Sequence, residues 1–90
     1  MSAITKFQGK SVISATGASQ TLAEENRARR ELFVYNTAAT DWTLNLLGGV
    51  AVVGAVDTVK LSPGDAISIT AINKITAIGT AASKLTVVEN

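Results

Sequence analysis

Residues 66–72 read AISITAI, an alternation of apolar and polar side chains with a period of two. In an extended strand this period places Ile67 and Ile69 on one face and Ser68 and Thr70 on the other. One face of such a strand packs against a core and the other meets water. The stretch therefore predicts a half-buried β-strand.

The residues before this strand predict a tight turn. Residues 62–65 read SPGD. Proline fixes φ at the second position of a turn, and glycine accepts the positive φ that a type II turn requires at the third. We therefore expect Gly64 to lie in the left-handed region.

Most of the chain after residue 30 follows the same plan of short β-branched runs separated by Gly, Pro, Asn and Asp. The predicted strands are 11–15, 32–36, 42–46, 50–53, 58–61, 66–72, 75–78 and 85–88, the last two joined as a terminal hairpin, and 19–22 is an open candidate for another. A single helical turn over 22–30 is an open alternative. Short strands at this spacing are typical of two architectures. The expected fold class is all-β, an antiparallel β-sandwich or small barrel of seven to eight short strands.

The inward faces of these strands predict the core. The nine residues expected to be buried are apolar and fall on the core-facing positions: Leu32, Val34, Trp42, Leu44, Leu61, Ile67, Ile69, Leu85 and Val87. Tyr35 is also expected to be a core residue. A sugar-binding platform needs two or three aromatic residues on one exposed face. The chain has only one Trp, one Tyr and two Phe, so its composition does not favour such a platform.

The length of 90 residues fits one compact domain. We divide it into 1–23, an N-terminal arm or first strands with a potential partner-contacting role, and 24–90, the β-sandwich. Cysteine and histidine are absent, which removes disulfides and the usual ligands of zinc, copper, haem and iron–sulfur clusters. We expect no cofactor and no metal.

The composition argues for a folded chain that associates with other proteins. It is 47% hydrophobic and 17% charged, with a net charge of +1. Such a chain is neither disordered nor attractive to nucleic acid, and its low charge favours association. No signal peptide or membrane-spanning stretch is evident, so we expect a soluble protein made in a cytoplasm, with no membrane partner.

Catalysis is not expected. Nucleophilic mechanisms need an activated side chain beside a base, and histidine and cysteine are missing. Glu24 and Glu25 form the only adjacent acidic pair, without the cleft that paired acids require. Gly48 and Gly49 are not followed by the Gly-Lys-Ser/Thr of a phosphate loop, so they predict a flexible turn.

Residues 24–31, EENRARRE, hold six of the fifteen charged residues. One interpretation is a solvated connection whose charges contribute little. The other is that Arg27, Arg29 and Arg30 form ion pairs with a neighbouring subunit. In this second interpretation residues 1–20 cross to the neighbour and Ile4 and Phe7 are further partner contacts, whereas the competing view has the N-terminal strand completing its own sheet.

Three segments resemble small β-sandwich virion proteins of tailed bacteriophages. Residues 26–36, NRARRELFVYN, are similar to an arginine-rich lead-in to a strand ending in Asn. Residues 61–66, LSPGDA, resemble the proline-glycine turn of those proteins, and 75–81 with 85–89 resemble their closing hairpin. The likeness spans residues 24–89.

This resemblance implies a non-catalytic virion structural protein. The expected role is that of a capsid decoration or cement protein, which binds the major capsid protein or another virion protein and forms a homo-oligomer. Its location would be the virion, after synthesis in the host cytoplasm. Two alternatives stay open: a host glycan- or receptor-binding module, and a tail or fibre accessory protein.

Overall fold

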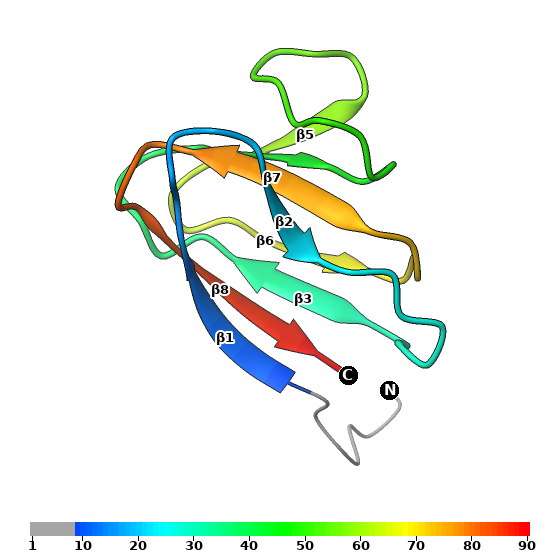
Figure 1. The fold of residues 1–90 in the computed structure, drawn as a ribbon. Helices are drawn as coiled ribbons and strands as arrows, with labels where there is room; N and C mark the ends of the chain where they lie inside the picture. The colour runs from blue at the N-terminus through cyan, green and yellow to red at the C-terminus, as the bar shows by residue number, and fades with distance from the viewer. Residues whose placement is uncertain (1–8) are drawn as a thin grey trace.

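The computed structural model describes residues 9–90, which form eight strands (Figure 1). The strands are β1 (Gly9–Ser14), β2 (Gln20–Ala23), β3 (Leu32–Tyr35), β4 (Trp42–Asn45), β5 (Thr58–Leu61), β6 (Ala66–Ile69), β7 (Ile75–Gly79) and β8 (Lys84–Glu89). No helix occurs in this part of the chain. The all-β prediction is confirmed.

The strands form two antiparallel sheets of four that lie face to face (Figure 1). The first sheet has the order β1-β8-β3-β6 and the second β2-β7-β4-β5. Each sheet keeps open edges, at β1 and β6 in the first and at β2 and β5 in the second. The architecture is therefore a small β-sandwich and not a closed barrel.

The core between the sheets is made of the inward-facing apolar residues. Of the nine predicted core residues all are buried except Ile67, which is half-buried and packs against the cluster. The prediction for Tyr35 is wrong, because its side chain is 40% exposed. Tyr35 follows the fully buried Val34 in β3, so the alternation of the strand turns Tyr35 to the opposite, solvent-facing side.

The predicted terminal hairpin is also wrong. β7 pairs with β2 and β4 in the second sheet, whereas β8 pairs with β1 and β3 in the first. The connection between them crosses from one sheet to the other. Its backbone bonds to Ala15, which donates its N–H to Ser83 O at 2.8 Å and accepts from Ala82 N at 2.9 Å. These hydrogen bonds hold the connection against a segment that is distant in the sequence. The residues of 75–88 alone therefore do not predict the crossing.

One further local prediction fails, and one open alternative is decided. Residues 50–53 form no strand, because the segment lies between Gly48 and Gly54, both with positive φ, in a loop fixed by side chains from elsewhere. The helical turn over 22–30 is replaced by strand through Ala23 and a turn at residues 27–28. In that turn the N–H of Arg29 donates to Asn26 O at 3.1 Å.

The described part of the segment 1–23 belongs to the sandwich. β1 pairs with β8 without interruption from Gly9 opposite Glu89 to Ser14 opposite Lys84. β2 pairs with β7, with a bulge between Thr21 and Ala23. β1 and β2 thus pair with strands of their own chain, and contact of the segment 1–20 with a neighbour stays a prediction. The candidate contacts Ile4 and Phe7 lie outside the described residues.

The turn at residues 62–65 has the predicted geometry. Gly64 has a φ of 85°, and Asp65 donates its N–H to Ser62 O at 2.9 Å. A Cβ at Gly64 would meet nothing within 4 Å. The conformation of the backbone alone therefore requires glycine here.

Replacing Gly64 with valine should lower the free energy of unfolding by about 1–2 kcal/mol, because a β-branched residue at positive φ is strained. Pro63→Ala removes only a restriction on the unfolded chain and should cost about 0.4–1 kcal/mol. Urea denaturation of both variants measures the difference. A Gly64→Val protein as stable as Pro63→Ala would contradict the turn assignment.

Candidate protein-binding surfaces

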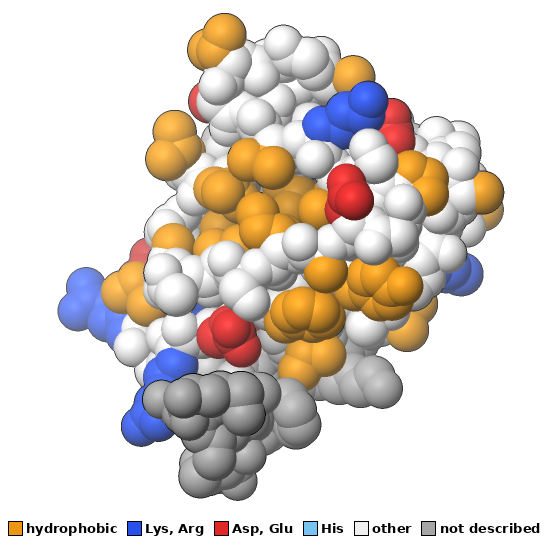
Figure 2. All heavy atoms as spheres, turned by 180° about the vertical axis from the view of Figure 1, so that it is seen from behind, with side chains coloured by type: hydrophobic (Ala, Val, Ile, Leu, Met, Phe, Trp, Pro, Cys, Tyr) orange, Lys and Arg blue, Asp and Glu red, His pale blue; other side chains and the backbone are white. Residues whose placement is uncertain are grey.

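The connection between β4 and β5 exposes a run of aliphatic side chains. Residues 47–56, which we call the valine loop, read LGGVAVVGAV and contain no charge. Leu47, Val50 and Val53 are each more than 70% exposed, Val52 is 53% exposed and Val56 is fully exposed. The loop projects above β5 in Figure 1 and forms the projection at the top of Figure 2, which carries hydrophobic side chains.

Polar groups on the outer face of the second sheet hold the backbone of the valine loop. Asn45 donates from Nδ2 to Val50 O at 3.2 Å and accepts the N–H of Leu47 at Oδ1, at 2.8 Å. Thr76 donates its hydroxyl to Gly49 O. Ala51 is buried and donates its N–H to Ser19 Oγ at 2.9 Å. The first half of the loop, residues 47–51, is therefore held against the sheet, and its larger side chains lie in solvent.

These contacts explain an exception in the alternation of β4. Thr43 and Asn45 alternate with the core residues Trp42 and Leu44, so they lie on the outer face of the sheet, in register with Ile78 and Thr76. Both are nevertheless buried. For Asn45 the burial follows from the overlying loop, to which its side chain is bonded. Sequence period alone does not show that a loop returns over the outer face.

A groove of about 750 Å³ lies beside the valine loop on the outer face of the second sheet. Val53 of the loop lines it together with Ala39, Ile78 and Ala81. Its charged lining residues are Asp41 and Lys60, whose Oδ2 and Nζ atoms are 3.4 Å apart. The groove is thus mainly apolar, with a charge pair that neutralises itself.

The outer face of the first sheet carries a second apolar surface, which we call the aromatic face. Phe33 and Tyr35 project from β3 and are 38% and 40% exposed. Val12 of β1 is 60% exposed and lies opposite Thr86, which in turn lies opposite Tyr35. Val88 lies opposite Phe33. The sandwich therefore has apolar side chains on both of its outer faces.

The three candidate arginines of residues 24–31 have different positions. Arg27 and Arg30 are exposed, and Arg27 Nε lies 3.7 Å from Glu25 Oε2. Arg29 is buried, with a side chain that has no exposure to solvent. A partner contact by Arg27 or Arg30 stays a prediction.

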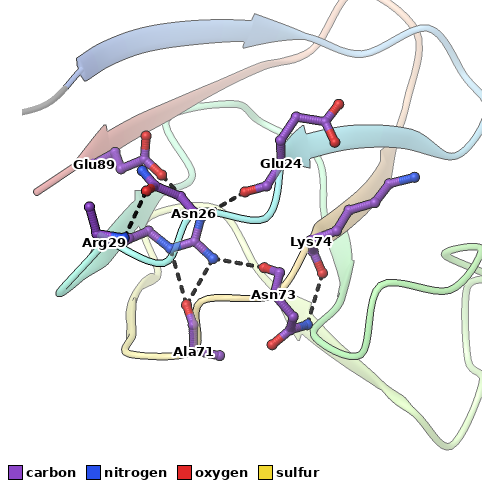
Figure 3. A network of polar contacts seen from close by, with 8 residues as sticks. Glu24, Asn26, Arg29, Ala71, Asn73, Lys74 and Glu89 are labelled. Atoms are coloured by element: carbon purple, nitrogen blue, oxygen red, sulfur yellow. Dashed lines mark hydrogen bonds and ion pairs between the residues drawn. The ribbon is translucent and has the colours of Figure 1, made fainter.

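Arg29 is instead the centre of an internal network (Figure 3). Its guanidinium donates to Ala71 O at 2.8 and 3.0 Å, to Asn73 O at 2.7 Å and to Glu24 O at 3.1 Å. It also bonds Glu89 Oε2 at 3.0 Å. These contacts join the connection before β3, the connection before β7 and the end of β8. The expectation that Arg29 contacts a neighbouring subunit is therefore corrected: its donors are used inside its own domain.

The acidic residues do not gather into a metal-binding group in the described part of the chain. Asp57 accepts from Asn45 Nδ2 at 3.1 Å, and Asp65 accepts the N–H of Ser62 at 3.0 Å within the turn. No helix in the described part of the chain has the length and apolarity of a membrane span.

Comparison of the chain with protein-family models, curated proteins and solved structures found no match. The fold and its surfaces therefore define the class: a small antiparallel β-sandwich with two exposed apolar faces.

Proposed function

We propose that this chain is a non-catalytic structural protein of a tailed-phage particle, most specifically a capsid decoration protein. In this role it binds the major capsid protein or another virion protein and also its own neighbours. The observation that carries the proposal is the pair of apolar surfaces on opposite faces of the sandwich, the valine loop and the aromatic face. A protein held between a shell and its neighbours needs two adhesive surfaces and no chemistry.

Exposed apolar groups gathered on one surface are typical of protein contacts. The valine loop places five aliphatic side chains within ten residues, and the backbone of its first half is already held by Asn45, Thr76 and Ser19. A fixed loop loses little conformational freedom when it binds, which favours affinity. Burial of five such side chains contributes on the order of 7–15 kcal/mol, against association costs of similar size. One loop alone therefore binds weakly, and a lattice of many contacts would bind firmly.

The net charge of +1 also supports assembly, because copies packed side by side repel one another little. The segments 26–36, 61–66 and 75–89 add the resemblance to phage virion proteins. The resemblance is the reason for proposing a phage particle in particular, whereas the surfaces support protein binding in general.

A glycan-binding role is the second candidate, and one observation favours it. Phe33 and Tyr35 lie two residues apart on the same outer face of β3, and both are partly exposed. Two aromatic rings on one face are the minimum for stacking a sugar. In this case the aromatic face would bind the host surface instead of the shell.

Co-sedimentation with particles tests the proposal. Particles made from a phage genome deleted for this gene are mixed with the purified chain, centrifuged and analysed on a gel. We expect saturable binding to the particles that is weakened by Val52→Asp or by Val12→Asp, one on each apolar surface. Thr37→Asp, exposed in the connection after β3 and part of neither apolar surface, is the matched control. No binding to particles, together with glycan-array binding that Tyr35→Ala abolishes, would favour the receptor-binding role instead.

A further inference from the structure

We infer that the valine loop and the groove beside it form one self-complementary surface on which a second copy of this chain docks about a two-fold axis. Each copy would place its loop in the groove of the other. The inference deepens the proposed function, on which it rests for the neighbour contact, by naming the surface that neighbouring copies share.

The first argument is that the projection and the hollow are adjacent. Val53 belongs to the loop and also lines the groove. A two-fold interface uses the same patch on both copies, so the patch must contain both complementary parts. The patch around Val53 contains both the projecting loop and the groove.

The second argument is the area required. Burying one aliphatic side chain contributes about 1.5–3 kcal/mol. At about 25 cal/mol per Å², this free energy corresponds to about 60–120 Å² of apolar surface. Five such side chains present on the order of 300–600 Å², less than the roughly 800 Å² that each partner contributes to a standard interface. The loop alone is too small for a stable dimer. Reciprocal exchange adds the groove of each copy and brings the buried area to the necessary scale.

The third argument is charge. The loop carries none, and the groove carries Asp41 and Lys60 as a pair at 3.4 Å. Covering this surface with a second copy therefore buries no unpaired charge. Burial of an unpaired charge would be costly. A lipid surface would instead favour a basic rim and aromatic residues. The loop has no aromatic residue, and Lys60 is neutralised by Asp41, so a protein partner fits better than a membrane.

Sedimentation equilibrium over a range of concentrations tests the inference. We expect the wild-type chain to dimerise and Val53→Asp to raise the dissociation constant by at least about tenfold, because a carboxylate would enter an apolar contact. Val53 is exposed in the monomer, so circular dichroism should show an unchanged melting temperature. Val12→Asp, on the aromatic face, is the control and should leave the dimer intact.

Disulfide trapping tests the geometry directly, since the chain has no cysteine of its own. Val52→Cys in the loop and Ala81→Cys in the groove are made as separate proteins, one tagged, then mixed and oxidised. Loop-in-groove docking predicts that the mixed dimer forms faster than the dimer from Val52→Cys mixed with Ser68→Cys. The dimer should persist at high salt, because no ion pair holds it together.

Several results would overturn the inference. These are a monomer at every concentration, a dimer that survives Val53→Asp but not Val12→Asp, equal trapping with Ser68→Cys, or binding of the loop to lipid vesicles without dimerisation. A dimer that salt dissociates and that charge reversal of Arg27 or Arg30 abolishes would assign the contact to the arginines. A monomer that still co-sediments with particles would contradict the two-fold docking but not the proposed function. A trapped dimer that never binds particles would contradict the proposed function but not the two-fold docking.

Discussion

Arg29→Met is expected to lower the free energy of unfolding by about 3–5 kcal/mol, because removing one partner from a buried charged network leaves the others unpaired. The carbonyl oxygens of Ala71, Asn73 and Glu24 lose their guanidinium donors, and Glu89 loses its cation. Methionine fills the space but offers no donor. Urea denaturation followed by circular dichroism measures the loss.

Two variants separate the network from charge alone. Arg29→Lys keeps the positive charge but cannot reproduce the planar fork, and we expect it to recover less than half of the lost stability. Arg30→Met removes an exposed arginine one residue away and should change stability by less than about 0.5 kcal/mol. Equal effects at positions 29 and 30 would show that the network contributes no more than a surface charge.

The burial of Arg29 could not be predicted from the local sequence. Three arginines lie within four positions of one charged segment, and nothing local distinguishes them. The distinction comes from residues 42 to 60 positions away, whose carbonyl and carboxylate oxygens converge on Arg29. A pattern read over a few residues cannot contain that information.

The same reason separates the predictable strands from the valine loop. The strand that begins at Ala66 and the turn at 62–65 follow from local chemistry, and both predictions are confirmed. The observed strand β6 ends at Ile69, three residues before the predicted end. The valines at 50, 52 and 53 have strand-forming side chains and were predicted as a strand. Their loop is decided by Asn45, Thr76 and Ser19, which lie on other elements.

Gly79→Ala is expected to lower the free energy of unfolding by about 2–3 kcal/mol, since extra volume in a close-packed core forces neighbours to move. Gly79 lies opposite Trp42 in the pairing of β4 with β7. A Cβ at Gly79 would lie 2.7 Å from an atom of the buried indole ring. The φ of Gly79 is not positive, so the cost is a matter of contact alone. Gly49→Ala, where the nearest atom would be at 3.4 Å, is the matched control and should cost much less.

A double-mutant cycle with Trp42→Leu identifies the cause. Leucine removes the ring that the new methyl group would strike, so Gly79→Ala in that background should cost less than about 1 kcal/mol, giving a coupling larger than the error of the measurement. The indole Nε1 has no hydrogen-bond acceptor among residues 9–90, so the cycle reports packing and not a lost hydrogen bond. Additive losses would show that Trp42 and Gly79 do not constrain each other. Because Gly79 also lines the groove beside the valine loop, a shift of the backbone at this position should reduce the trapping of Val52→Cys with Ala81→Cys together with stability.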